Sequence, residues 1–391
     1  MEKKSQNLAE VSEASVYRRY AAAAQQREAA LCCPIEYSAD LLAVIPTEVI
    51  ERDYGCGDPT PFVLPGETVL DLGAGGGKLC FIAAQVVGPK GRVIGVDCNR
   101  EMLGLAKKHA PTVAERLGYN NVDFRYGMIQ DLKLDLALLE RELLEHPIQN
   151  AEDYLRLRQL QEELQRSAPL VADNSVDCVV SNCVLNLVRH EDRRQLFAEI
   201  ARVLRPGGKA AISDIVSSAE IPEEMQRDPE LWSGCISGAF REDEFLQAFE
   251  RAGFEGIMIA KRSAEPWQTV NGIDFRSVTV VAYKRAACVL SDSEGDIIYR
   301  GPFKHVVDEN GQTYHRGIRT PVDQTTLQRL MLPPYEQAFY AAEPIPAATT
   351  TGREPQASGD EHSGRSESER PVFQISGNPA GGCCGPDSSC C

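Results

Sequence analysis

The chain has 391 residues and a formal net charge of −16, with 43% hydrophobic and 25% charged residues. This composition is normal for a globular core, and the length allows one large domain with appendages or two ordinary domains. The negative charge argues against a nucleic-acid partner and against binding to anionic membrane surfaces. The start, MEKKSQNLAE, leads into no apolar segment typical of a signal peptide, and no apolar run of transmembrane length follows. We therefore expect a cytoplasmic protein.

The first part of the chain, residues 1–66, is predicted to form a helix and cysteine-bearing loops. Residues 15–30 are rich in alanine, with tyrosines at helical spacing, which predicts a helix that Pro34 ends. The following YGCGDPTPF segment contains two glycines and two prolines, so we expect no regular structure there.

From Thr68 the pattern becomes an alternation of short apolar runs and amphipathic stretches. Strands are predicted at 68–73, 92–97, 122–127, 175–182, 209–215 and 275–284, and helices at 78–88, 100–118, 193–204 and 241–254, with a kink at Pro111 and a stop at the RPGG segment. Such alternation predicts an α/β fold, a doubly wound and mostly parallel seven-stranded sheet, over residues 67–285.

Three segments lie outside this alternation. Residues 133–166 are charged and helix-forming, which predicts a helical hairpin broken at Pro147; it would be either a solvated flap or an arm that binds a partner. Residues 286–340 are predicted to form a small appendage with a hairpin through DENGQT, whose Asn-Gly pair is typical of a turn. Residues 341–391 have the composition of a disordered tail and end in GGCCGPDSSCC.

The segment LDLGAGGG follows the first predicted strand and opens a helix. Its glycines, Gly73, Gly75 and Gly77, would let a ligand approach the backbone at a helix N-terminus. Asp71 precedes them, and Asp97 ends the second strand, where a carboxylate is placed to accept two ribose hydroxyls. We assign three further residues to the same ligand: Met128, Ile129 and Asn182. The order of strand, acid, glycine turn, helix, strand and acid resembles the S-adenosylmethionine site of class I methyltransferases more than a nicotinamide site.

Thirteen cysteines are many for a protein in a reducing compartment, where they are more often ligands, redox groups or core residues than disulfides. Cys80, Cys178 and Cys288 lie in apolar stretches or near a strand end and are predicted core residues, and Cys98 is a predicted packing residue near the ribose.

Cys56, Cys183 and Cys235 are different because each occupies its own turn, and the ends of parallel strands should bring these turns to one edge. Zinc sites usually contain local pairs such as C-x2-C, which these three lack. Thiolates select soft acceptors, so a soft atom that is itself the substrate fits better. Cys183 also lies between two asparagines, Asn182 and Asn186.

Four segments, YGCG, DLGAGGG, SNCVLNLV and LWSGCISGA, resemble the arsenite methyltransferases over about residues 15–285. The resemblance implies that Cys56, Cys183 and Cys235 hold trivalent arsenic, in arsenite or methylarsenite, for methylation by S-adenosylmethionine. It also implies a fourth cysteine, Cys32 or Cys33, with Cys33 preferred, in a disulfide cycle that thioredoxin or glutathione resets. Arsenic detoxification by a monomer is the expected function. The chain departs from the family in its long insertion and in the short spacing between Cys33 and Cys56.

Two other functions are compatible with the same residues. One is methylation of another small nucleophile, such as a selenium, thiol or quinone substrate. The other is a protein that only sequesters metalloid, which the retained methyl-donor motif disfavours. For the cysteine pairs of the tail, capture and delivery of metalloid and an oxidation-prone end without a role both remain open.

Overall fold

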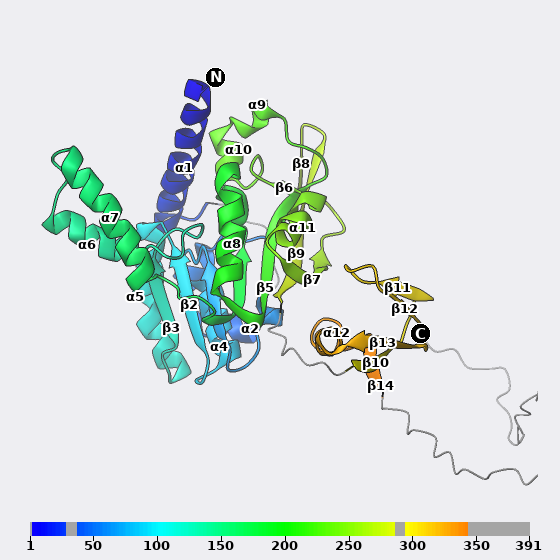
Figure 1. Cartoon of the computed structure of the whole chain (residues 1–391). Coiled ribbons are helices and arrows are strands. Elements are labelled where there is room, and N and C mark those ends of the chain that lie inside the picture. Colours follow the sequence, from blue (N-terminus) through cyan, green and yellow to red (C-terminus); the bar gives the residue numbers. More distant parts are fainter. Residues whose placement is uncertain (1, 29–36, 286–293, 343–391) are drawn as a thin grey trace, which may run out of the picture. The chain divides into compact units, whose positions relative to one another are not determined.

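The computed structural model describes residues 2–28, 37–285 and 294–342. Its main body is built on a central sheet with helices on both faces (Figure 1). Among the described helices, none combines the length and the apolar character that a bilayer span requires. The predicted class of fold is confirmed.

The central sheet has nine strands, and its main path runs in the order β3-β2-β1-β4-β5-β9-β7. The strands of this path are β1 (Thr68–Leu72), β2 (Arg92–Asp97), β3 (Val122–Tyr126), β4 (Val176–Asn182), β5 (Leu204–Ser217), β7 (Phe254–Arg262) and β9 (Ile273–Lys284). The pairs from β3 to β5 are parallel, whereas β9 runs antiparallel to both β5 and β7. Two short strands, β6 (Phe240–Arg241) and β8 (Gln268–Val270), pair with β5 and β9. Strand β7 was not recognised in the sequence.

Two core clusters cover the two faces of this sheet. One packs α8 (Arg193–Val203) and α11 (Glu242–Arg251) against residues such as Leu70 and Leu72 of β1. The other packs α4 (Lys78–Val87) and α5 (Arg100–Leu117) against the opposite face, which includes Val69. Because successive side chains of a strand point to opposite faces, β1 contributes to both clusters. The carboxyl ends of β1, β2 and β4 are thereby held at one edge.

The predicted helices and loops are corrected at three places. Helix α1 is described over Glu2–Gln25, which starts earlier and ends sooner than the predicted 15–30. A short 3-10 helix, Thr60–Phe62, lies in the loop that was expected to lack regular structure; its Pro61 fits the first turn, where no amide hydrogen is needed. Strand β5 begins directly after α8, so the RPGG segment belongs to the strand. Helix α5 includes Pro111, as the predicted helix does, and ends at Gly118, whose φ is +79°; the kink at Pro111 stays a prediction.

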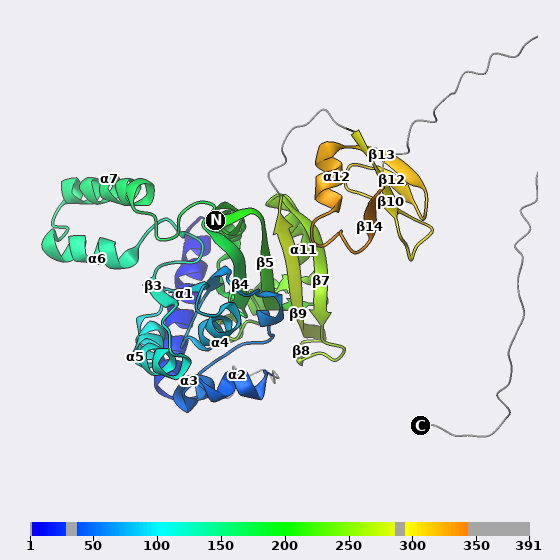
Figure 2. The ribbon, with the colours of Figure 1, turned by 90° about the horizontal axis from the view of Figure 1, so that it is seen from below.

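The predicted helical hairpin is confirmed as α6 (Leu136–Glu145) and α7 (Ala151–Ser167). Asp135 and Asn150 cap the two helices by accepting hydrogen bonds from amides of the first turn. No residue of α7 is buried. The hairpin extends away from the central sheet (Figure 2).

The C-terminal appendage is larger than the predicted hairpin. It contains the three-stranded sheet β13-β10-β14, the pair β11-β12 and a helix, with Ile297, Tyr299 and Phe339 in its core. The elements are β10 (Glu294–Tyr299), β11 (His305–Val307), β12 (Thr313–His315), β13 (Arg319–Asp323), α12 (Gln324–Leu330) and β14 (Phe339–Ala342). The Asn-Gly hairpin is confirmed as β11-β12. The tail boundary at 341 was wrong, because Ala341 pairs with Ile297 and Ala342 with Asp296.

Two glycines provide a matched test of the packing between α4 and the sheet. A Cβ atom on Gly95 of β2 would lie 2.7 Å from Cys80 Sγ and 2.8 Å from the Ala74 Cβ, whereas one on Gly104 of α5 would meet nothing within 4 Å. We predict that Gly95→Ala lowers the free energy of unfolding by about 1–3 kcal/mol through overpacking. Gly104→Ala should raise it by roughly 0.5–1 kcal/mol because alanine favours the helix. Urea denaturation measures both, and equal effects would contradict the close packing at Gly95.

Candidate active site

A cavity of about 490 Å³ opens at the carboxyl ends of β1, β2 and β4. Its wall includes the turn after β1, the residues after β3 and, on one side, Tyr17 and Tyr20 of α1. Helix α1 is held there because Asn99 donates a hydrogen bond to the Tyr17 carbonyl and Arg52 donates one to the Ala24 carbonyl. Of the residues assigned to a ligand from the sequence, the cavity is lined by Asp71, Gly73, Gly75, Asp97, Met128, Ile129 and Asn182.

The three motif glycines have different roles. Gly73 has a φ of +74°, and a Cβ atom there would lie 2.5 Å from the Val184 side chain. Gly75, with a φ of +51°, lines the cavity, and a Cβ atom there would meet nothing. Gly77 does not line the cavity: it caps α4, and a Cβ atom there would lie 2.8 Å from Phe124. Gly77 thus has a packing role next to Phe124, and its expected ligand contact stays a prediction.

Asp97 ends β2 at the cavity wall. Its Oδ2 accepts a hydrogen bond of 2.8 Å from the Gly75 amide, and its Oδ1 accepts one of 2.7 Å from the Asn99 amide. Burial raises its pKa, and these amides oppose that shift. A carboxylate oxygen can accept more than one hydrogen bond, so both oxygens retain capacity for ligand hydroxyls.

Asp71 is 1% exposed and also borders the cavity. Its Oδ2 accepts a hydrogen bond of 3.1 Å from the Cys80 thiol, while its Oδ1 has no hydrogen-bond partner among the described residues. Burial raises its pKa to about 7, although the bond from Cys80 lowers it. A buried carboxylate oxygen without a partner is costly. The cavity therefore offers an acceptor that a cationic or hydrogen-bonding ligand group would satisfy.

Three thiols from distant segments lie next to this cavity. Cys56, Cys183 and Cys235 are 5%, 7% and 4% exposed and belong to one buried group, which we call the thiol cluster, together with Ile215, Ile221, Met225, Ile236, Ala239, Ile273 and Phe275. Cys183 also lines the cavity. The apolar members keep water away from the sulfur atoms, and Cys183 connects the cluster with the cavity.

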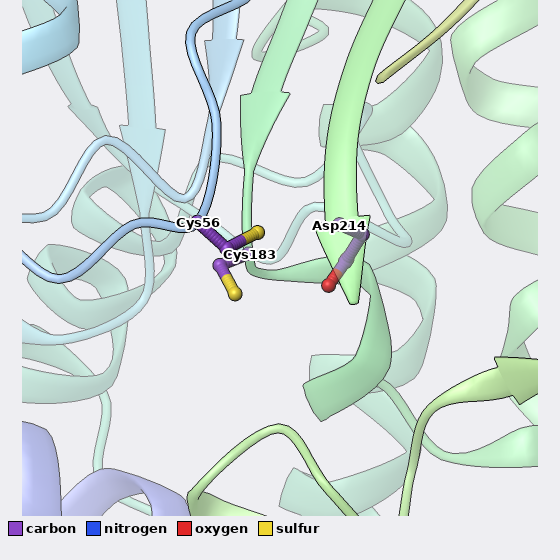
Figure 3. A group of neighbouring side chains, drawn as sticks. All are labelled: Cys56, Cys183 and Asp214. Carbon is purple, nitrogen blue, oxygen red and sulfur yellow. The ribbon is translucent and has the colours of Figure 1, made fainter. Parts of the chain in front are cut away.

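The sulfur atoms are close to one another and to a carboxylate. The Sγ atoms of Cys56 and Cys183 and a carboxylate oxygen of Asp214 all lie within 4.8 Å of one another (Figure 3). Cys235 Sγ donates a hydrogen bond of 3.3 Å to the Cys183 carbonyl. The structure thus brings together the three cysteines that the sequence analysis selected.

Cys183 and Cys235 have an unusual backbone, each with a φ of +62°. This left-handed region is disfavoured for residues that carry a Cβ atom, and such strain is concentrated at functional sites. Cys183 and Cys235 therefore both have a backbone conformation that glycine would adopt more easily, yet both positions carry a thiol side chain.

The thiols are not activated in this state. A hydrogen bond with Cys183 and burial raise the pKa of the Cys235 thiol well above its usual value. For Cys183 the hydrogen bond with Cys235 lowers the pKa, but the bond with Cys56 and burial outweigh it. Both thiols therefore carry their protons at neutral pH, and a soft ligand would have to displace them.

Asn182 is fully occupied by the loop of Cys56. Its Oδ1 accepts hydrogen bonds from the Cys56 amide (2.9 Å) and the Gly57 amide (3.1 Å). Its Nδ2 donates to the Gly57 carbonyl (2.7 Å) and to the Tyr37 hydroxyl (3.1 Å). This side chain therefore positions Cys56, while Asn182 also borders the cavity, and its expected role in cofactor binding stays a prediction.

The second asparagine, Asn186, binds two other segments. Its Nδ2 donates hydrogen bonds of 2.7 Å to Asp214 Oδ1 and to the Ile215 carbonyl, and its Oδ1 accepts one of 3.3 Å from the Phe240 amide, after the Cys235 turn. Asp214 was missed in the sequence analysis. The signal was present, because Asp214 lies near the end of a strand, as Asp71 and Asp97 do.

The remaining cysteines divide into two groups. Cys80 and Cys178 are fully buried, as expected of core residues, and Cys98 lines the cavity. The cysteines that lie outside the described residues are Cys32, Cys33, Cys288 and the four of the tail, Cys383, Cys384, Cys390 and Cys391. The predicted redox role of Cys33 stays a prediction.

The Asn182 contacts can be tested directly. Asn182→Ala removes the acceptor of two amides, a loss of about 1–3 kcal/mol that should speed hydrogen exchange at Cys56 and Gly57 roughly 10- to 100-fold. Asn121→Ala, which removes contacts with the Ala84 and Gly88 carbonyls, is the control and should leave these amides unchanged. Unchanged protection in Asn182→Ala would contradict the positioning role.

The raised pKa of Asp71 predicts a pH-dependent stability. Its folded pKa of about 7 lies above the ordinary value of 3.8, so the stability of the buried neutral form is present at low pH and is lost as pH rises through about 7. Asp71→Asn cannot ionise, so it does not lose this stability. The difference in free energy of unfolding between Asp71→Asn and the parent chain should therefore rise by about 1–3 kcal/mol from pH 5 to pH 8. Urea denaturation at both pH values measures the change. Asp173→Asn, at a largely exposed acid, should show no such gain.

Comparison with known proteins adds to this geometry. Residues 64–163 and 150–253 match the family model of a methyltransferase domain, and residues 286–369 match a domain of unknown function (DUF8838). An arsenite methyltransferase of Halobacterium salinarum is 38% identical over 58% of this chain, and one of Aquipseudomonas alcaligenes is 36% identical over 55%. These two matches span 47% and 51% of the relatives, about half of their length. The human arsenite methyltransferase is 29% identical over 88% of this chain and 86% of its own length.

A solved structure also matches over most of the chain. CrArsM, an arsenic(III) S-adenosylmethionine methyltransferase from Chlamydomonas reinhardtii, aligns with a TM-score of 0.53 and 25% identity. The alignment covers 79% of this chain and 96% of that structure. With these matches, the chain has the class I S-adenosylmethionine-dependent methyltransferase fold, and it is similar to arsenite methyltransferases over most of its length.

Proposed function

We propose that the chain methylates trivalent arsenic, which the thiols of Cys56, Cys183 and Cys235 hold beside the methyl-donor cavity. The observation that carries this proposal is the convergence of these three buried cysteines, from three segments, with Cys183 shared by the cluster and the cavity. Core packing does not account for two of them in the left-handed region of the backbone.

The cavity fits S-adenosylmethionine, which supplies an electrophilic methyl group on a sulfonium sulfur when it is bound. The two acceptor oxygens of Asp97 suit vicinal ribose hydroxyls, and the unpaired Asp71 Oδ1 suits an ammonium group. Met102, Met128 and Ile129 contribute apolar wall. Helix α1, through Tyr17 and Tyr20, keeps water from the reacting groups.

Protonated thiols are no obstacle to loading of arsenite. Each thiol that binds replaces one hydroxide of arsenous acid, and its proton leaves with that hydroxide as water. Three thiols therefore bind arsenic with release of three waters and no net change in charge. Trivalent arsenic is a soft acceptor and prefers thiolate sulfur to the oxygen of hydroxide. The exchange of ligands is therefore favourable.

Methylation oxidises arsenic formally from the trivalent to the pentavalent state, so a further turnover requires two electrons. We propose that a cysteine pair supplies them by forming a disulfide, with Cys33 as the candidate partner and thioredoxin or glutathione as the external reductant. The resulting role is arsenic detoxification in the cytoplasm, where thiols are kept reduced.

The direct test uses the purified chain with S-adenosylmethionine, a thiol reductant and arsenite, followed by speciation of the arsenic. Methylated arsenic above the level without protein supports the proposal. Conversion of a selenium, thiol or quinone substrate in place of arsenite, or arsenic that stays bound without methylation, would refute it.

Cysteine variants test the role of each thiol. Serine is nearly isosteric but a poor ligand for a soft acceptor, so Cys183→Ser or Cys235→Ser should abolish methylation of arsenite and of methylarsenite. Cys33→Ser or Cys56→Ser should stop the first methylation and leave turnover of methylarsenite at least partly intact, since that substrate has only two sites for thiols. Arsenic speciation with each substrate is the measurement.

Cys178→Ser is the matched control because Cys178 is fully buried in β4, the strand that Cys183 follows, and belongs to the core. It should keep both activities, and the melting temperature reports on folding in all variants. A folded Cys183→Ser chain that methylates both substrates would overturn the assignment of the thiol cluster.

A further inference from the structure

Asp214 binds Asn186, but this bond does not require an ionised group, and the thiol chemistry described above does not use one. It lies in β5 with 0% exposure, and a carboxylate oxygen is within 4.8 Å of the Sγ atoms of both Cys56 and Cys183 (Figure 3). Any atom that these two thiols hold between them is therefore a near neighbour of the carboxylate.

The carboxylate is fixed in place by neutral donors. Oδ1 accepts hydrogen bonds from Asn186 Nδ2 (2.7 Å) and the Ile215 amide (2.8 Å), and Oδ2 accepts a longer one from the Asn186 amide (3.3 Å). Since both donors to Oδ1 are part of the fold, the orientation of the carboxylate is set before a substrate arrives.

No cation within the described residues forms an ion pair with Asp214. The cation that acts on it electrostatically is Arg193, whose guanidinium lies over the Phe240 ring and donates to the Val188 and Gly238 carbonyls. A buried carboxylate without an ionic partner opposes folding. The presence of this carboxylate beside the thiols points to a positive charge that arises there only during the reaction.

Methyl transfer produces such a charge. The arsenic lone pair forms the new bond to the methyl carbon, the bond between that carbon and the sulfonium sulfur breaks, and its electron pair stays on sulfur. Sulfur becomes neutral, while arsenic is formally oxidised from +3 to +5 and becomes positively charged. The positive charge thus moves from the donor to the arsenic.

We propose that Asp214 is a catalytic residue whose carboxylate stabilises the positive charge that develops on the thiol-bound arsenic. This inference rests on the proposed function and adds a residue to its mechanism. Because carboxylate oxygen is a hard donor and the thiols are soft, Asp214 acts through its charge while sulfur supplies the ligands. Its interaction strengthens only as the transition state forms, so it should change the rate of transfer and leave the binding of both substrates unaffected.

The experiment separates loading from transfer. The chain is loaded with arsenite under a thiol reductant, the ratio of arsenic to protein is measured after gel filtration, and the affinity for S-adenosylmethionine is measured by calorimetry. The loaded protein is then mixed with excess S-adenosylmethionine, and a single turnover is followed by rapid quenching and arsenic speciation.

Asp214→Asn keeps the shape and an acceptor for Asn186 but removes the charge. Asp214→Ser is prepared in parallel, because either variant tests the charge once its melting curve shows that it is folded. Asp177→Asn removes a carboxylate that pairs with Arg205 near the other end of the neighbouring strand β4, and it is the control for loss of an acid as such.

We expect the charge-removing variants to retain arsenic and S-adenosylmethionine as the parent chain does, and to transfer the methyl group roughly 10²- to 10³-fold more slowly. Asp177→Asn should transfer at the parent rate. A folded variant with the parent rate of transfer overturns the proposal. Loss of arsenic retention with an unchanged rate from the loaded fraction also overturns it, because Asp214 would then serve in loading. A parent chain that forms no methylated arsenic refutes the proposed function itself.

Discussion

The hydrogen bonds of the Asn182 amide are the interaction on which the site depends. They join the end of β4 to the Cys56 loop, 126 residues away in the sequence. Without them the loop, which contains two glycines and two prolines, would have few constraints of its own. Because Cys183 is the next residue, one strand end holds the loop of one thiol and presents another. The Ser277 hydroxyl donates to the Cys56 carbonyl and binds the same loop to β9.

Asn186 has the corresponding function on the other side of Cys183. It binds Asp214 and the Phe240 amide, so the turn that follows β4 is connected with β5 and with the segment after Cys235. Gly238 allows this approach, since a Cβ atom there would lie 2.1 Å from the Asn186 carbonyl oxygen. Cys183 thus lies between two asparagines, and the side-chain amide of each asparagine binds one of the segments that complete the thiol cluster.

The same edge of the sheet collects buried carboxylates. Asp71, Asp97 and Asp214 lie near the ends of β1, β2 and β5, and burial raises the pKa of each. These groups oppose folding unless a ligand or a developing charge compensates them. Two left-handed cysteines add strain at the same place. These groups destabilise the fold at the place where a bound cofactor and substrate would stabilise it. The two core clusters on the faces of the sheet stabilise the remainder of the domain.

The amino-acid pattern was enough to predict the class of fold, the helical insertion, the glycine turn with its two acids, and the choice of Cys56, Cys183 and Cys235 among thirteen cysteines. These features are encoded locally, by hydrophobic period, by turn residues and by residue type. It did not reveal that Gly77 lies against Phe124, that the Asn182 side chain binds the Cys56 loop, or that Ala341 and Ala342 pair with β10. The proximity of Asp214 to two thiols became visible only in the folded chain, because that contact joins three segments distant along the sequence. Side-chain direction and long-range pairing depend on how the strands assemble, and no local pattern records them.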